Sequence, residues 1–333
     1  MNLLSLLQRT AENIAGNNDA TSTPGGIWSW LARCANDACP HKWRVVPFRI
    51  RKSGAFQVED RWFCGPGCAQ DFLLLRVRSL ISRFRSAAPR AHRIPIGMLL
   101  VNRGAIDRIS LQQALFRQKK DPPRRLGEQL LSLGAIDEFQ LAVALSQQWA
   151  CPYYPLESQP VELLPFSLAP LEIFRASRSA PAYISADERS LHVAFCERVD
   201  HTMLYALESM LDCRTFPSVA TASAVKNALD SRATLFPRQE PFFETVRDPR
   251  DISAILASYA AEIRASRLKL VRTQHHLWGR LLRGKVVRDV LFLLPENPQA
   301  AIRSSAIPAN EPDNSAHSRN DNVSQFSVGV RAR

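Results

Sequence analysis

PIGMLLVNRGAIDRISLQQALFRQ, from Pro95 to Gln118, is followed by RLGEQLLSLGAIDEFQLAVALSQQ, from Arg125 to Gln148, and the two stretches share one pattern. Each matched pair is separated by 30 residues, as in Gly97 and Gly127 (127 − 97 = 30). The other matches are Leu100 with Leu130, Gly104 with Gly134, Ala105-Ile106-Asp107 with Ala135-Ile136-Asp137, Leu111 with Leu141, Leu115 with Leu145, and Gln118 with Gln148. A period of this length indicates a repeated supersecondary unit, here a helix–turn–helix.

The residues inside one unit predict where its helices begin and end. Gly104 and Gly134 stand where a helix C-terminus needs a left-handed residue, which glycine adopts without a Cβ clash. Asp107 and Asp137 follow at the N-cap position of the next helix. Gly97 and Gly127 lie early in the first helix of each unit, where glycine is unfavourable. We therefore expect a close approach to the backbone there, either by another helix or by a flat ligand.

This double pattern resembles the N-terminal domain of type II secretion and type IV pilus assembly ATPases, in the MshE-type version that binds cyclic di-GMP. That family carries two tandem copies of RLGxxLxxxGxxxxxxLxxxLxxQ. The second copy here fits at Arg125, Leu126, Gly127, Leu130, Gly134, Leu141, Leu145 and Gln148. In the first copy Pro95 replaces the leading arginine and Ile96 the leucine, and Arg93 is the candidate substitute.

The resemblance implies a cyclic di-GMP site across the two units. Its expected parts are glycines that admit a flat base, arginines for phosphates and stacking, leucines as apolar walls, and glutamines as polar end groups. The candidate nucleotide-binding residues are Arg93, Gly97, Leu100, Gln118, Arg125, Leu126, Gly127, Leu130 and Gln148. The alternative is that the glycines and leucines only pack four helices against one another.

Composition allows several small domains and acidic partners. The chain has 333 residues, a formal net charge of +12 and a pI of about 9.8. Such a charge suits a nucleotide, a nucleic acid or an acidic protein face, although it also serves solubility alone. Seven cysteines without regular pairing, no secretory signal and no run long enough to span a bilayer predict a reducing, cytoplasmic location.

Four of the cysteines predict a metal site. Cys34 and Cys39 are spaced C-x4-C, and Cys64 and Cys68 are spaced C-x3-C. Between the pairs, 44–51 and 55–63 alternate apolar and polar residues around Lys52-Ser53-Gly54, and a helix follows Cys68. This order is typical of a treble-clef or ribbon module, in which four thiolates hold structural zinc. The alternative is four free or partly disulfide-bonded cysteines.

A basic segment leaves a nucleic-acid interpretation open. No acidic residue occurs between Phe72 and Ile106, whereas arginine recurs. These arginines either follow phosphates or lie on a solvated helix and linker. They are Arg76, Arg78, Arg83, Arg85, Arg90 and Arg93.

The rest of the chain predicts an α+β protein of several domains. Residues 151–231 form a small α/β subdomain: helix 163–176, strands 182–185 and 191–195, helix 201–211 after Asp200, strand 216–219 and helix 223–229. The remaining segments are an N-terminal helix and linker (1–30), the zinc module with its basic helix (31–86), the repeats (93–150), a helix with a β-hairpin (249–295) and a disordered tail (296–333). The hairpin strands are expected at 267–272 and 277–282, and this segment resembles the one that precedes the motor in the same ATPases.

One stretch imitates a P-loop. Residues 279–286, GRLLRGKV, match G-x4-G-K but end in Val286, which has no hydroxyl for a magnesium ion. We therefore expect a non-enzymatic module, without the ATPase motor, that binds cyclic di-GMP, docks to secretion or pilus machinery, or both. The alternatives are a pure protein adaptor, a zinc-dependent nucleic-acid binder and an inactive subunit that regulates a separate ATPase.

Overall fold

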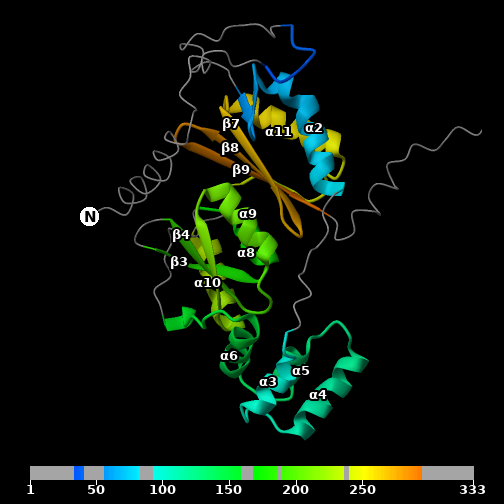
Figure 1. Cartoon of the computed structure of the whole chain (residues 1–333), viewed down its shortest axis with the longest axis vertical. Helices are drawn as coiled ribbons and strands as arrows, with labels where there is room; N and C mark the ends of the chain where they lie inside the picture. Colours follow the sequence, from blue (N-terminus) through cyan, green and yellow to red (C-terminus); the bar gives the residue numbers. More distant parts are fainter. Residues whose placement is uncertain are drawn as a thin grey trace, which may run out of the picture.

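The computed structural model describes residues 34–40, 56–82, 93–158, 168–185, 189–235 and 240–294. The expected N-terminal helix, the C-terminal tail, the predicted strand 44–51 with its turn, and Arg83, Arg85 and Arg90 lie outside these residues. Figure 1 shows three stacked parts: a sheet with helices α2 and α11, an α/β unit, and the four helices of the repeats. The mixed α+β class expected from the sequence is confirmed.

The first part is a six-stranded sheet that joins segments far apart in the sequence. Its strand order is β2-β1-β7-β8-β9-β6. The strand bounds are β1 Phe56–Val58, β2 Arg61–Phe63, β6 Phe242–Phe243, β7 Arg267–Arg272, β8 His276–Arg283 and β9 Val286–Leu293. β1 pairs in parallel with β7, with Gln57 opposite Arg267. The segments expected as a separate zinc module and a separate C-terminal hairpin therefore share one sheet.

Two predicted strands differ from the structure for local reasons. The single strand expected over 55–63 is broken into the hairpin β1–β2, because Glu59 adopts a left-handed φ of 52° and turns the chain. The expected two-stranded hairpin at the C-terminal end gains a third strand, β9, which pairs antiparallel with β8 along its whole length.

Alternation along β7, β8 and β9 makes the sheet apolar on both faces. One face carries Leu268, Leu277, Leu281, Val290 and Phe292 and packs under helices α2 (Pro66–Ser82) and α11 (Pro249–Glu262). Gly279 belongs to this face, since a Cβ there would lie 2.7 Å from Cδ2 of Leu256 on α11. The other face carries Val271, Trp278 and Leu291, which join the core of the α/β unit. The sheet therefore lies between helices α2 and α11 on one face and the α/β unit on the other.

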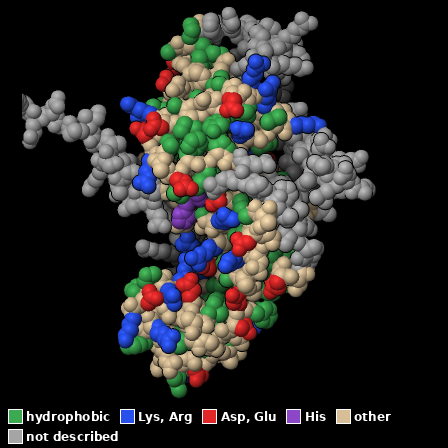
Figure 2. All heavy atoms as spheres, turned by 180° about the vertical axis from the view of Figure 1, so that it is seen from behind, with side chains coloured by type: hydrophobic (Ala, Val, Ile, Leu, Met, Phe, Trp, Pro, Cys, Tyr) green, Lys and Arg blue, Asp and Glu red, His purple; other side chains and the backbone are tan. Residues whose placement is uncertain are grey.

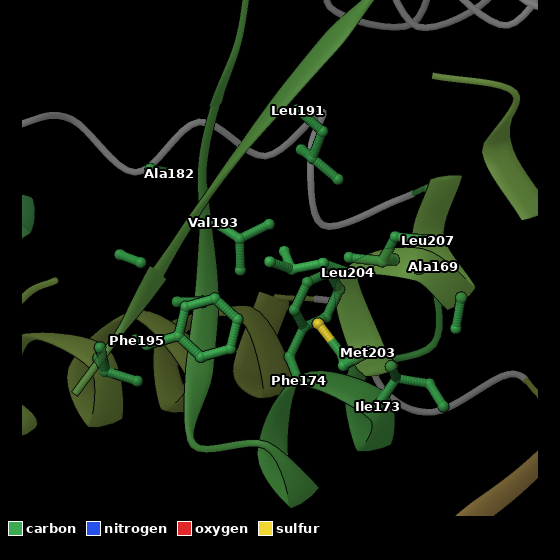
Figure 3. Close-up of a cluster of buried hydrophobic side chains, with 14 of the residues drawn as sticks. Ala169, Ile173, Phe174, Ala182, Leu191, Val193, Phe195, Met203, Leu204 and Leu207 are labelled. Atoms are coloured by element: carbon green, nitrogen blue, oxygen red, sulfur yellow. The ribbon is translucent and has the colours of Figure 1, made fainter. Parts of the chain in front are cut away.

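The α/β unit follows the predicted order, but the helix expected over 163–176 begins only at Leu171, with Pro170 at its N-cap. Its elements are α8 Leu171–Ala176, β3 Ser179–Ile184, β4 Ser190–Phe195, α9 His201–Leu211, β5 Arg214–Val219 and α10 Ala222–Leu235, after the short 3-10 turn η4 Leu156–Ser158. β4 pairs antiparallel with β3 and in parallel with β5. As predicted, Asp200 caps α9 by accepting hydrogen bonds from the backbone N–H groups of Thr202 and Met203. Figure 3 shows Phe174 of α8 packed between Val193 and Phe195 of β4 and Met203 and Leu204 of α9.

The two repeats form four short helices: α3 Ile96–Asn102, α4 Arg108–Lys120, α5 Leu126–Ser132 and α6 Glu138–Trp149. Gly104 and Gly134 adopt φ values of 69° and 66°, so both predicted left-handed C-termini are confirmed. Asp107 and Asp137 accept hydrogen bonds from the backbone N–H groups of Ser110 and Gln140, as N-caps do. The buried core of the bundle consists of Leu100, Ile106, Ala114, Leu130, Ile136 and Ala144.

A buried ion pair lies where the six-stranded sheet meets the α/β unit. Arg280 donates from Nη2 to Oδ2 of Asp289 and from Nε to Oδ1, both at 2.7 Å, and their side chains are only 8% and 10% exposed. Trp278 Nε1 donates to the same carboxylate at 2.8 Å, and Arg280 also donates to the carbonyl of Leu168. The guanidinium of Arg280, the carboxylate of Asp289 and the indole N–H of Trp278 are therefore paired with one another on this apolar face.

We predict that Asp289→Ala lowers the free energy of unfolding by about 3–5 kcal/mol, because it leaves the Arg280 charge buried and uncompensated. Denaturant unfolding followed by circular dichroism measures the change. The matched control is Glu262→Ala, which removes an exposed carboxylate 3.9 Å from Arg288 and should change stability by less than about 1 kcal/mol. Equal effects of the two substitutions would contradict the role of the buried pair.

Candidate functional site

Four cysteines converge at the N-terminal edge of the six-stranded sheet. The Sγ atoms of Cys34, Cys39, Cys64 and Cys68 all lie within 4.8 Å of one another. The Sγ–Sγ distance is 3.5 Å between Cys39 and Cys64 and 3.2 Å between Cys64 and Cys68. A tetrahedral zinc ion with Zn–S bonds of about 2.3 Å requires S–S edges of about 3.8 Å. The cluster thus has the size and ligand set of a structural zinc site.

Local backbone structure holds the four thiols in place. Cys68 lies in the first turn of α2, which begins at Pro66, a residue suited to that position because its missing N–H needs no partner. Asn36 donates from Nδ2 to the carbonyl of Cys68 at 3.1 Å and its Oδ1 accepts from Ala38 N–H at 2.9 Å. Ala35 N–H donates to the carbonyl of Trp62 on β2. The two cysteine pairs are therefore joined by the sheet hairpin and the helix.

The protonation of the thiols depends on a compensating charge. Burial, followed by the hydrogen bond that Cys64 donates to Cys68 and its hydrogen bond with Cys39, raises the pKa of Cys64 above its usual range. Burial also raises the pKa of Cys68. Thiolates this close repel one another, and a divalent cation at their centre removes that cost.

The repeat bundle has an internal two-fold arrangement. Gln118 at the end of α4 donates from Nε2 to the carbonyl of Arg124, just before the second repeat begins, at 3.3 Å. Gln148, its counterpart on α6, donates to the carbonyl of Ile94, just before the first repeat begins, at 2.9 Å. Since Ile94 and Arg124 are also 30 residues apart, each repeat fastens the start of the other.

The repeat glycines are packing positions. A Cβ on Gly97 would lie 2.7 Å from Cδ1 of Leu111 and 3.2 Å from Cδ2 of Leu126. A Cβ on Gly127 would lie 2.8 Å from Cδ1 of Leu141. Of the two approaches expected from the sequence, the structure thus shows leucine side chains of neighbouring helices at both glycines. Leu100 and Leu130 are fully buried behind them.

Arg125 is the most accessible of the predicted ligand-binding residues in the bundle. It stands at the N-cap of α5, where its backbone N–H donates to Glu128, and its side chain is 57% exposed. Its Nη1 lies 3.0 Å from Oε2 of Glu197, in the loop after β4 of the α/β unit. Arg178 pairs with the same Glu197 and approaches Glu128 at 3.6 Å. An ion network therefore joins the second repeat to the α/β unit at the candidate site.

Arg93 is not one of the residues of this ion network, which consists of Arg125, Arg178, Glu128 and Glu197. Its guanidinium carbon is 3.3 Å from the ring centroid of Trp149, the last residue of α6. Burial, followed by the charge of Arg198, lowers the pKa of Arg93. No motif in the sequence pointed to Glu197, Arg178 or Arg198, since all three follow strand or helix ends of the α/β unit.

The imitation P-loop is a β-hairpin. Gly279 lies within β8, and Gly284, with φ of 54°, forms the turn into β9. A P-loop needs a helix N-terminus directed at the phosphates, whereas here a strand follows the turn.

No helix in the described residues is long and apolar enough to cross a membrane.

Comparison with solved structures finds relatives for part of the chain. No protein-family model and no curated protein matches the chain. A solved structure of MshE with cyclic di-GMP has 30% sequence identity and aligns with 42% of this chain and 99% of that chain, at a TM-score of 0.37. The chain therefore contains an MshE-type N-terminal domain. The N-terminal domain of XpsE, in two crystal forms, matches 44% of this chain at 15% and 17% identity, with TM-scores of 0.31 and 0.26 and coverage of 96% and 97% of those chains.

The repeats and the α/β unit are joined to elements from both sides of them in the sequence. The sheet with the cysteine cluster, built from residues before the repeats and after the α/β unit, packs against the α/β unit through Val271, Trp278 and Leu291. Lys269 on β7 also reaches Asp212 at 2.5 Å, at the C-terminus of α9.

We predict that Gly127→Val destabilises the MshE-type domain by about 1–3 kcal/mol, because its Cβ and branched methyls displace Leu141 from a packed bundle. Thermal unfolding of the full chain measures this. Gly67→Ala is the control: a Cβ on Gly67, in the first turn of α2, meets nothing within 4 Å, and alanine favours the helix. A neutral Gly127→Val would show that the bundle tolerates separation of α5 and α6.

Proposed function

We propose that this protein is a non-enzymatic receptor module that binds cyclic di-GMP on its MshE-type domain and docks to secretion or pilus machinery. The observation that carries the proposal is the 30% identity to MshE over nearly the whole of that chain, together with an arginine, Arg125, at the start of the second repeat. The absence of a P-loop fold in residues 279–286 supports the non-enzymatic part.

The ligand-binding residues divide into those that shape the bundle and those that reach the ligand. Gly97, Gly127, Leu100 and Leu130 are buried and fix the crossing of the helices. Leu126 is half-buried beside Gly97, and Arg125 is exposed next to it. We propose that a guanine packs at this helix start and that the guanidinium of Arg125 binds a phosphate or stacks on the base.

The first repeat supplies a different cation. Pro95 cannot replace the arginine of the family pattern, and Arg93 lies on the ring of Trp149, whose indole holds it by a cation–π contact. We propose that Arg93 serves the second half of the ligand only if it leaves Trp149. Gln118 and Gln148 already donate to backbone carbonyls, so they act on the ligand through their amide oxygens or by fixing the repeat ends.

Arg125→Ala is predicted to weaken cyclic di-GMP binding by roughly 10- to 100-fold, because a hydrogen bond to a charged group contributes about 1.5–3 kcal/mol. Glu197→Gln is predicted to tighten binding by about two- to fivefold, since an exposed ion pair that competes with the ligand is worth at most about 1 kcal/mol. Isothermal titration of the full chain measures both.

Arg214→Ala is the matched control, because Arg214 is an exposed arginine on β5 with no ion pair in the described residues. Absence of heat for the wild type and for Glu197→Gln at high micromolar ligand would refute nucleotide binding and leave the adaptor interpretation.

For the cysteine cluster we propose one structural zinc ion, held by Cys34, Cys39, Cys64 and Cys68. All four ligands are thiolates, which leaves no open position for a substrate water. The ion would fasten residues 34–40 to β2 and to the first turn of α2.

Elemental analysis of protein purified without chelator should find one zinc per chain, and a strong chelator should lower the melting temperature, since the metal binds the folded state alone. Cys64→Ser should lose most of the zinc, whereas Cys213→Ser, outside the cluster, should retain it. The proposed zinc site would be refuted if the protein held less than half an equivalent of metal and its four thiols titrated freely.

A further inference from the structure

Helix α4 is the most open helix of the repeat bundle. Ala114 is its only buried residue, and Leu111 lies half-buried beside it. Ile109, Leu115 and Phe116 are 65%, 41% and 59% exposed. Ile109 and Phe116 are seven residues apart, so they lie on one side of the helix. Figure 1 shows α4 on the outer side of the bundle, at the end of the molecule opposite the six-stranded sheet.

The counterpart helix α6 uses the corresponding side to dock within the chain. Glu138 on α6 accepts hydrogen bonds from the N–H and hydroxyl of Ser223 at 2.9 and 2.7 Å. Phe139 packs edge-on against Tyr153 at 5.2 Å, and Trp149 packs against the core of the α/β unit. The positions 30 residues earlier on α4 are Arg108, Ile109 and Lys119, and all three are exposed. The same side of the repeat is therefore partly covered on α6, where Phe139 remains 54% exposed, and more open on α4.

The open side carries cations around its apolar residues. α4 contains Arg108, Arg117, Lys119 and Lys120 and no acidic residue, and none of these four forms an ion pair within the described residues. Lys120 Nζ lies 4.5 Å from the ring centroid of Phe116. The nearest carboxylates, Asp107 and Asp121, are engaged with Ser110 N–H and with Arg124. Figure 2 shows Lys and Arg side chains beside hydrophobic ones on the lobe that the repeats form.

We propose that α4 is a peripheral membrane-binding surface that takes anionic phospholipid headgroups. Ile109 and Phe116 would enter the headgroup boundary, and the long stems of Arg108, Arg117, Lys119 and Lys120 would keep their charges at the level of the lipid phosphates. The helix stays folded for this contact, because Leu111 and Ala114 hold its inner side in the bundle. The inference is independent of nucleotide binding.

The shape and composition of this side favour a lipid surface over other acidic partners. A single convex helix presents no groove in which a protein segment would be enclosed, whereas a bilayer adapts to a convex surface. Nucleic-acid phosphates would satisfy the cations but would leave Ile109 and Phe116 in water. Lipid headgroups accept the cations, and the acyl boundary accepts the two apolar side chains.

The test is co-sedimentation of the full chain with vesicles of phosphatidylcholine mixed with phosphatidylglycerol, and with vesicles of phosphatidylcholine alone. We expect binding to the mixed vesicles only. Each cation near an anionic surface strengthens binding by about fivefold, so Lys119→Glu with Lys120→Glu should weaken it by at least about 25-fold. Phe116→Ser should weaken binding while leaving all charges in place. High salt should weaken binding through screening.

The matched control is Arg78→Glu with Arg214→Glu, which changes net charge equally at two exposed arginines away from α4. This control should bind the mixed vesicles nearly as well as the wild type. Circular dichroism establishes that every variant is folded. The proposal is overturned by a wild type that ignores mixed vesicles, by α4 variants that bind like the control, or by tighter α4-dependent binding to duplex DNA than to vesicles.

Discussion

A sheet buried on both faces is the constraint on which most of this structure depends. Strands β7, β8 and β9 present leucine, valine and phenylalanine to helices α2 and α11 and, one residue further along, valine, tryptophan and leucine to the α/β unit. A polar side chain on either face must find its partner within the protein. Arg280, Asp289 and Trp278 satisfy one another for this reason, and Arg280 adds a bond to the carbonyl of Leu168. The layers are thereby joined at a defined register.

The same sheet connects the part of the molecule that contains the four-cysteine cluster to the α/β unit. β1, which follows the first two cysteines, lies beside β7, and Arg272 at the end of β7 donates to the carbonyls of Leu80 and Ile81 at the C-terminal end of α2. A cation there interacts favourably with the helix dipole. The four-cysteine cluster is thus linked to the α/β unit through one continuous sheet.

In the repeat bundle, internal symmetry and its loss have different consequences. The symmetry is kept at Gln118 and Gln148, which donate equivalent hydrogen bonds, and at Gly97 and Gly127, which contact equivalent leucines. The symmetry is lost on the outer side, where α6 contacts Ser223 and Tyr153 and the equivalent residues of α4 are exposed. It is also lost at the helix starts, where Arg125 pairs with Glu197 and the equivalent position of the first copy holds the uncharged Pro95. The second copy therefore contacts the α/β unit through α6, whereas the first copy exposes α4 to solvent.

The sequence determined the local features whose cause lies within a few residues. The 30-residue period, the left-handed glycines at 104 and 134 and the caps at Asp107, Asp137 and Asp200 follow from backbone sterics and nearby hydrogen bonds, and the structure has all of them. The cysteine spacings likewise predicted the four-thiol cluster. Tertiary structure alone decided the pairing of β1 with β7, because these strands come from distant segments and are brought together only by the packing of the whole molecule. It also decided that leucines occupy the space at Gly97 and Gly127, and that Glu197, which lies 72 residues after Arg125 (197 − 125 = 72), is the carboxylate beside it. Such long-range pairings carry no local sequence signal, since they depend on how whole elements pack.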